Sequence, residues 1–273
     1  MARLLYVVRS RKVVVYAGQG DPRRSIELLW RAGAAQEKRP GPRPGLSVDA
    51  IVDAAIAVAD EAGTAALSMR AVGDRLGRTA MALYTYVPGK NELVDLMYDR
   101  AMAELPTSCD TADGWRAAVM RWAQDMWEFY GRHPWVLQVS QARPVLGPHE
   151  FAVIESLAAV LVPTGLPGRE LRGIVGAINY FVRGAAQTLA EARAARSATG
   201  EADEEWWYAR SAVLMEVEPE LATRFPMLHL LENDREPPAA DPELPYLEND
   251  AVENFRRGLA VLLDGVEAAV AKL

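Results

Sequence analysis

The side chains best suited to bind another molecule lie in a short stretch between residues 78 and 90. This stretch combines arginine, lysine, threonine and tyrosine with small residues at close spacing. Arginine can donate to guanine edges or phosphate, threonine and alanine can contact thymine methyl groups, and tyrosine can contact phosphate or bases. On a helix, the outward face would present Arg78, Thr79, Met81, Ala82, Tyr84 and Thr85. These residue types favour recognition of double-stranded DNA.

Residues for catalysis, in contrast, form no recognisable pattern. The three histidines, His133, His149 and His229, have no carboxylate at a recurring metal-ligand spacing. The sequence contains no HExxH motif, no glycine-rich phosphate loop and no nucleophile elbow. A single cysteine, Cys109, excludes an internal disulfide and a cysteine-based metal cluster. We therefore predict that the protein is not an enzyme and binds no metal or cofactor.

Three short helices are predicted to position the stretch that suits DNA. Ser47 is a good N-cap for a first helix, which ends at Gly63. Ser68 caps a second helix, which ends at Gly77, where glycine allows a left-handed turn without steric cost. The third segment covers Thr79–Tyr86. This order is typical of a helix-turn-helix, whose last helix enters the major groove.

The same region closely resembles the DNA-binding domain of the TetR family of bacterial transcriptional regulators. The resemblance rests on residues 67–77 (LSMRAVGDRLG) and 82–93 (ALYTYVPGKNEL), and the preceding residues 51–63 fit the family's first helix. It implies that the DNA-binding residues are Ser68, Arg70, Arg78, Thr79, Ala80, Met81, Ala82, Tyr84, Tyr86 and Lys90. The segment from residue 78 to 82 would read bases, with little side-chain hydrogen bonding, and the others would contact phosphate or the groove wall.

Two of these assignments leave an alternative open. Tyr84 and Tyr86 are two residues apart and cannot share a helix face, so we expect Tyr84 to face DNA while Tyr86 could pack under the motif. Lys90 would bind phosphate, but it could instead be an ordinary solvated lysine at a helix start.

The fold class is predicted to be all-α apart from the N-terminal extension. We expect a helix-turn-helix domain at residues 46–105 and a larger helical domain at residues 106–273, with no strand beyond residue 20 and an irregular, proline-rich stretch at 219–245. Apolar periodicity beyond the third helix predicts helices over Asn91–Leu105, Gly114–His133, Glu150–Leu161, Leu171–Arg196, Glu204–Val217 and Tyr246–Leu273.

The resemblance implies that the larger domain binds a small molecule and forms a homodimer through its long helix and its last helix. The candidate ligand-binding residues are Trp122, Met126, Tyr130, His133, Asn179, Arg183, Gln187 and Trp206. The first four concentrate aromatic and polarisable surface on one helix, and the next three lie four residues apart. The aromatic stripe could instead be core, and Asn179 and Arg183 could lie at the dimer interface.

Charge is divided unevenly along the chain, whose net charge is -7. Residues 1–45 contain ten Lys or Arg and three acids, a net charge of +7, whereas residues 46–105 sum to -4 and residues 106–273 to -10. Within this basic extension two β-prone runs, Leu4–Val8 and Val13–Ala17, could form a hairpin, and Pro22–Trp30 is predicted to be helical before a Pro/Gly linker at 40–45. The extension could contact DNA or be a solvated tail.

These observations predict a cytoplasmic, dimeric transcriptional regulator. It would be a repressor that leaves its operator when a small apolar or aromatic molecule binds. No apolar run approaches the roughly 20 residues that cross a bilayer, so we expect no membrane partner. The alternative is a DNA-tethered factor whose acidic C-terminal domain recruits a protein partner and senses no ligand. An enclosed apolar cavity in that domain would favour the ligand-responsive repressor over this alternative.

Overall fold

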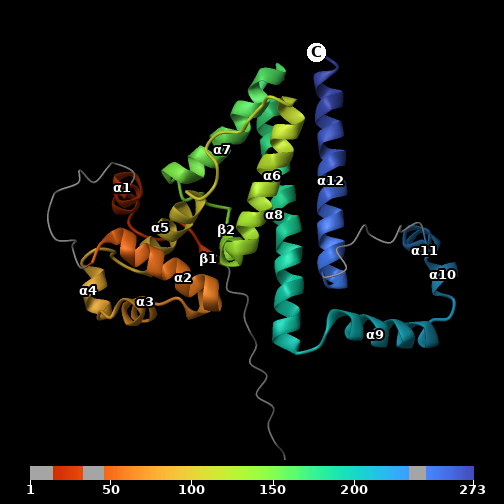
Figure 1. Cartoon of the computed structure of the whole chain (residues 1–273), viewed down its shortest axis with the longest axis horizontal. Helices are drawn as coiled ribbons and strands as arrows, with labels where there is room; N and C mark the ends of the chain where they lie inside the picture. The colour runs from red at the N-terminus through yellow and green to blue at the C-terminus, as the bar shows by residue number, and fades with distance from the viewer. Residues whose placement is uncertain (1–14, 33–45, 234–243) are drawn as a thin grey trace, which may run out of the picture. The chain divides into compact units, whose positions relative to one another are not determined.

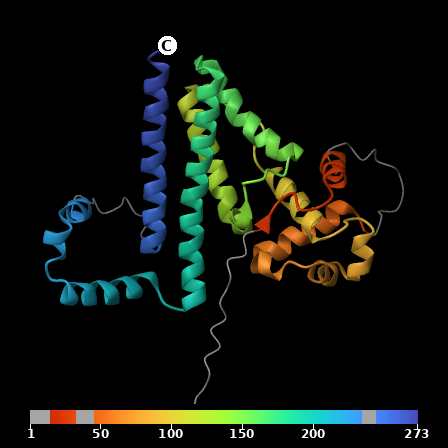
Figure 2. The same cartoon turned by 180° about the vertical axis from the view of Figure 1, so that it is seen from behind.

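The computed structural model describes residues 15–32, 46–233 and 244–273 (Figures 1 and 2). The chain divides into two compact units, Met1–Leu161 and Val162–Leu273. None of the helices in the described ranges has the length and apolar character needed to cross a membrane. Helices account for nearly all the regular structure of the described residues, as the sequence predicts.

The first unit contains the predicted helix-turn-helix. Its helices are α2 (Val48–Ala66), α3 (Met69–Leu76) and α4 (Ala80–Tyr84), followed by α5 (Lys90–Met102). The predicted caps are confirmed, because the hydroxyl of Ser47 accepts the N–H of Ala50 and that of Ser68 accepts the N–H of Ala71, both at 3.1 Å. Gly77 takes the left-handed conformation, with φ 63°. Gly63, with φ 72°, interrupts α2 near its end.

The described part of the N-terminal extension packs within the same unit. Strand β1 (Val15–Tyr16) pairs in parallel with β2 (Val139–Ser140), and α1 (Pro22–Ala32) is the short helix predicted there. The expectation of no strand beyond residue 20 is therefore wrong, because β2 forms through a tertiary contact and not through a local pattern. The run Leu4–Val8 and the Pro/Gly linker lie outside the described residues.

The rest of the first unit lies beyond the predicted boundary at residue 105. It contains α6 (Gly114–Arg132), the 3-10 helix η1 (Pro134–Gln138) and α7 (Pro148–Leu161). These elements join the helix-turn-helix because α7 packs against α5 and α6, while η1 packs against α2. The compact unit therefore extends to Leu161, past the domain boundary that the sequence predicts at residue 105. The division into a DNA-binding and a ligand-binding domain at residue 105 remains a prediction.

The second unit is built around α8 (Gly168–Thr199) and α12 (Tyr246–Val270), which lie side by side (Figures 1 and 2). The rings of Phe181 and Phe255 stack across this seam at 6.1 Å. Gly258 permits the close approach, since a Cβ there would lie 2.6 Å from the Phe181 ring. The residues buried in the seam are Ile178, Val182, Ala186, Leu189, Ala251, Phe255, Leu259, Leu263 and Val266.

Smaller helices complete the second unit. They are η2 (Val162–Thr164), α9 (Asp203–Val217), α10 (Leu221–Arg224) and α11 (Pro226–Asn233). The expectation of an irregular stretch at 219–245 is wrong in its first half, which holds α10 and α11. Pro226 does not prevent this, because a proline is tolerated in the first turn of a helix, where its missing N–H would have no partner.

Candidate DNA-binding surface and effector-domain residues

Helix α4 is held in place by its buried face and by a close turn. Leu83 and Val87 are fully buried, as is Val72 on α3. The backbone N–H of Arg78 donates to the carbonyl oxygen of Gly73 at 2.9 Å, and a Cβ on Gly73 would lie 2.6 Å from the carbonyl oxygen of Arg78. Glycine at this position therefore lets α3 and the turn approach closely, which fixes α4 relative to α3.

The opposite side of this element exposes the residues predicted to read DNA. Met81 is 75% exposed, Tyr84 43% and Tyr86 38%. Arg78 and Thr79 are exposed too, while Ala80 and Ala82 are half-buried. The hydroxyl of Thr79 also caps α4 by accepting the N–H of Ala82 at 3.4 Å.

Tyr86 does not pack under the motif, which sequence spacing left open. Helix α4 ends at Tyr84, and the N–H of Tyr86 then donates to the carbonyl of Leu83 at 2.9 Å in a turn. Because the chain has left the helix, the rule that places residues two apart on different faces no longer applies. Both tyrosines are exposed and available to a partner.

The three predicted phosphate-contacting residues differ in what they touch. Ser68 and Arg70 are exposed at the start of α3, and the guanidinium of Arg70 lies 3.8 Å from the carboxylate of Asp74. Such an exposed pair is weak and leaves the arginine able to reach another anion. Lys90 is not simply solvated, since its Nζ donates to the carbonyl oxygen of Leu67 at 2.7 Å. It therefore ties the start of α5 to the connection between α2 and α3.

Four of the candidate ligand-binding residues are buried on or next to α6 in the first unit. Trp122, Met126 and Tyr130 are almost fully buried, and the indole N–H of Trp122 donates to the hydroxyl of Ser156 at 3.2 Å. This burial agrees with the alternative that the aromatic stripe belongs to the core. His133 is also buried but makes polar contacts with other elements of the unit.

The other four candidates belong to the second unit. Asn179, Arg183 and Gln187 are half-buried along α8, and the side-chain amide of Gln187 donates to Glu191 at 2.9 Å. Trp206 on α9 is partly exposed, with the guanidinium of Arg210 lying 5.2 Å from its ring centre. The eight candidates are thus divided between the two units, and their role in ligand binding remains a prediction.

Comparison with known proteins identifies the family of this chain. Residues 51–97 match the domain described as "Bacterial regulatory proteins, tetR family", and residues 107–270 match "Tetracyclin repressor-like, C-terminal domain". The chain belongs to the TetR family. It is therefore a TetR-family transcriptional regulator with a helix-turn-helix that binds DNA.

Relatives of this TetR-family chain include named regulators. It is 39% identical to the HTH-type transcriptional repressor DrrR1 of Streptomyces coeruleorubidus, over 94% of this chain and 89% of the relative. It is 30% identical to an HTH-type transcriptional regulator of Saccharopolyspora erythraea, over 54% and 63% of the two chains. Among solved structures, ActR of Streptomyces coelicolor in complex with actinorhodin shares the fold, with TM-score 0.65, 23% identity and coverage of 84% and 98%.

Contacts between the TetR helix-turn-helix and α6 escaped the sequence reasoning. His133 Nδ1 lies 2.8 Å from Asp60 Oδ1 on α2, and the indole N–H of Trp135 donates to the same oxygen at 2.8 Å. His133 Nε2 lies 3.2 Å from Glu104, just beyond α5. The hydroxyl of Thr64 donates to the amide oxygen of Gln138. The end of α6 and η1 are therefore fastened to the DNA-binding helices, and His133 serves this junction.

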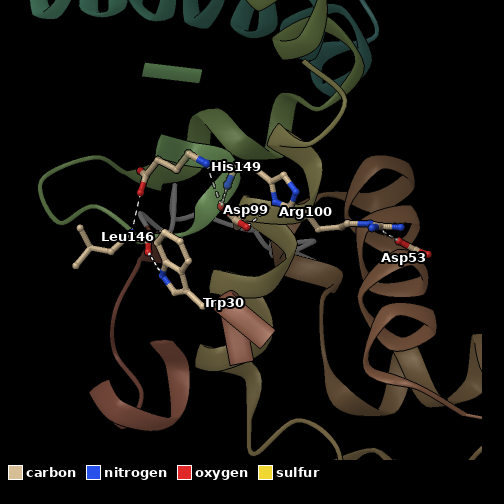
Figure 3. Close-up of polar contacts among 7 residues, drawn as sticks. Trp30, Asp53, Asp99, Arg100, Leu146 and His149 are labelled. Atoms are coloured by element: carbon tan, nitrogen blue, oxygen red, sulfur yellow. Dashed lines mark hydrogen bonds and ion pairs between the residues drawn. The ribbon is translucent and has the colours of Figure 1, made fainter. Parts of the chain in front are cut away.

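Two ion pairs also join the helices of the TetR DNA-binding region. Arg75 on α3 forms a bidentate pair with Glu61 on α2, with both N–O distances 2.8 Å. This hydrogen bonding lowers the pKa of Glu61 and raises the pKa of Arg75. Arg100 on α5 lies 3.2 Å from Asp53 on α2 (Figure 3). Neither pair could be assigned from spacing, since the partners lie on different helices.

A row of buried acids on α5 was missed as well. Glu92, Asp95 and Asp99 are spaced by three and four residues, so they lie along one helix face, and all three are buried. The regular spacing of these acids among apolar residues is visible in the sequence. Their partners, however, come from distant parts of the chain.

Proposed function

We propose that the protein is a dimeric, cytoplasmic repressor that releases its operator when a small apolar or aromatic molecule binds its C-terminal domain. The observation that carries this proposal is the TetR helix-turn-helix, in which a rigidly supported α4 exposes Arg78, Met81 and Tyr84. The name of the 39% identical relative, a transcriptional repressor, supports the sign of regulation.

Dimer formation is supported by apolar surface that one chain leaves open in the second unit. Helix α9 projects away from the α8–α12 pair (Figures 1 and 2), and exposed apolar side chains lie along α9 and α11. They include Tyr208, Met215, Val217, Met227, Leu228, Leu230 and Leu231. A surface of this kind typically marks a protein interface. A dimer also has a mechanistic reason, because one short helix reads too few base pairs and two half-sites need a symmetric reader.

The class of effector is argued from the aromatic content of α6. Trp122, Met126 and Tyr130 make α6 rich in aromatic and polarisable side chains, which favours an aromatic effector if this core opens to admit a ligand. ActR, which shares the fold, is known in complex with actinorhodin, and this supports a small organic ligand for the present chain. Ligand binding would shift α5, and the recognition helices would no longer match the half-site spacing. No catalytic step, metal or cofactor takes part.

Selection of bound DNA fragments from the source genome tests the function. We expect a small set of fragments that share a two-fold symmetric pair of half-sites one helical turn apart. Genes beside these fragments would then supply candidate effectors, and a true effector would release the selected fragment from the purified protein. Binding without sequence preference, abolished by moderate salt, would contradict the proposal. Capture of a protein partner, with no response to any effector, would favour the alternative of a DNA-tethered factor that recruits a protein.

A further inference from the structure

Helix α5 is covered on nearly every side, which is unusual for a helix of a small DNA-binding domain. All eight residues from 92 to 99 are buried, and so are Ala101 and Met102. A helix at a domain surface normally leaves one face to solvent. Here α2 and α7 pack against α5, and α1 packs on it as well. The N-terminal extension therefore provides part of the cover of α5.

The segment that does this, residues 15–32, is called the docking segment below. It is anchored at its start, where β1 pairs with β2 and Ala17 is buried. The backbone N–H of Gly18 donates to Asp95 Oδ1 at 2.9 Å, and Leu29 is buried on α1. In both views of the molecule α2 lies between α1 and α3 (Figures 1 and 2). The docking segment thus packs against α5, on the side of α2 away from α3.

Trp30 anchors the other end of the docking segment. Its indole N–H donates to the carbonyl oxygen of Leu146 at 3.0 Å (Figure 3), and its ring lies 6.1 Å from that of Phe151 on α7. The loop that accepts this bond leads directly into α7. One tryptophan therefore connects the extension to the elements that flank α5.

The acids of α5 hold the flanking loops through backbone N–H groups. Asp99 Oδ1 accepts from the N–H groups of His149 and Glu150 at 2.9 and 3.0 Å, and its Oδ2 lies 2.8 Å from His149 Nδ1 (Figure 3). It thereby caps the start of α7, as Asp95 holds Gly18 of the docking segment. Both acids of α5 therefore hold backbone N–H groups of neighbouring segments.

Glycines make this packing possible. A Cβ on Gly20 would lie 2.2 Å from Glu92 Oε1, and a Cβ on Gly147 would lie 2.1 Å from Asp99 Oδ1. Both loops therefore approach the acids of α5 more closely than any other residue would allow without movement. The docking segment and the loop before α7 therefore pack closely against α5 at these two glycines.

We propose that the docking segment is a positioning element for α5. By bonding to Asp95 and Leu146 it holds α5, and with it the helix-turn-helix, in the arrangement that binds DNA. Weakening the segment leaves α5 to be ordered when DNA binds, and this ordering lowers affinity without removing a DNA contact. The link to DNA affinity rests on the proposed function, whereas the hold on α5 does not.

Hydrogen exchange of the full chain tests the hold on α5. In Trp30→Ala, amides of α5 should exchange about tenfold faster, while amides of the α8–α12 seam keep their rates as an internal control. In Trp30→Phe, which keeps a ring but loses the N–H donor, the exchange rates of α5 should lie between those of wild type and those of Trp30→Ala. The matched control is Arg23→Ala with Arg24→Ala, which removes two exposed charges from α1 and should leave α5 unchanged. Unchanged exchange of α5 in Trp30→Ala would overturn the proposal.

The salt dependence of DNA binding then separates positioning from direct contact. With a genome-selected fragment, Trp30→Ala should bind about three- to tenfold more weakly with the same salt slope as wild type, since no phosphate contact is lost. A smaller salt slope in the Arg23, Arg24 double variant would mean that α1 itself binds DNA, and would overturn the proposal. If wild type selects no specific fragment, the proposed function fails, and exchange alone decides the hold on α5.

Discussion

Tyr84 and Lys90 illustrate how residues predicted for one role can differ in structure. Tyr84 is 43% exposed on α4, where it can reach a partner outside the chain. The ammonium group of Lys90 donates one hydrogen bond to the carbonyl oxygen of Leu67 inside the domain. The two residues should therefore respond differently to mutation, even if both contact DNA.

Tyr84→Ala should lower affinity for the selected operator about tenfold and change the melting temperature little, because the side chain lies at the surface of the domain. Lys90→Ala should lower both affinity and stability, by about 1 kcal/mol of unfolding free energy, since Leu67 loses a charged donor. Calorimetry and DNA titration of both variants measure this difference, with Lys90→Arg as the conservative control. Unaltered DNA binding in the Tyr84, Lys90 double variant would show that the helix-turn-helix assignment is wrong.

Gly147→Ala should destabilise the first unit by about 2 kcal/mol, because the new methyl group would overlap the carboxylate of Asp99. The matched control is Gly173→Ala on α8, where nothing lies within 4 Å of the added Cβ. That change should be neutral or stabilising by up to about 1 kcal/mol, because alanine favours the helix. Chemical denaturation of the two variants provides the comparison. Equal effects would contradict the close packing described at Asp99.

At the scale of elements, α5 is defined by the acids that it buries. Burial raises the pKa of Asp95 to about 6, opposed by the N–H of Gly18 and reinforced by the charge of Glu92. Burial also raises the pKa of Glu150, which follows the start of α7. Asp99 and His149 face the same region. Keeping several carboxylates together in this interface is unfavourable when all are ionised.

Stability should therefore fall with rising pH on account of Asp95. A carboxyl whose folded pKa lies above its unfolded value stabilises the fold in its protonated form, and this contribution is lost as pH rises from about 4 through about 6. Asp95→Asn keeps an acceptor for Gly18 and removes the ionisation. At pH 7.5 it should raise the unfolding free energy by about 1 kcal/mol, allowing for screening by solvent.

The measurement is the unfolding free energy of both proteins from pH 4 to pH 8. The difference between variant and wild type should grow across the window between about pH 4 and pH 6 and stay constant above it, which cancels the titration of all other groups. A variant that is less stable than wild type at every pH would show that the charged form of Asp95 is the favoured one.

At the scale of the whole molecule, the second unit is incomplete in a single chain. Its buried seam lies between α8 and α12, whereas Val261 on α12 is 70% exposed and the apolar side chains of α9 and α11 are open. Residues 106–273 carry a net charge of -10, whereas the N-terminal extension, residues 1–45, carries +7. A second copy of the chain is the proposed cover.

Val261→Asp should weaken the dimer at least about tenfold, because it places a charge on an apolar surface that a partner would bury. Sedimentation velocity across micromolar concentrations measures the shift, and circular dichroism should show the same helix content as wild type. Met120→Asp, at an apolar position on α6 in the other unit that is 49% exposed, is the control and should remain dimeric. A wild-type chain that is monomeric at these concentrations would contradict the half-site argument.

The sequence by itself was enough to predict the helix-turn-helix. Ser47, Ser68 and Gly77 act on backbone groups within three or four residues, so their effects can be read from neighbouring letters. The pattern of residues 67–93 then led to the TetR family, which the matched domains confirm. Apolar periodicity likewise predicted the long helices, with bounds that differ by a few residues, but it missed α10 and α11.

Only the tertiary structure decided the role of the N-terminal extension and of His133. Gly18 and Asp95 are separated by 77 residues, His133 and Asp60 by 73, and His149 and Asp99 by 50. No local periodicity encodes a contact at such separations, because the partner depends on how complete helices pack. The sequence therefore cannot predict the partner of Asp95 on α5, because only folding brings the N–H of the distant Gly18 to its carboxylate.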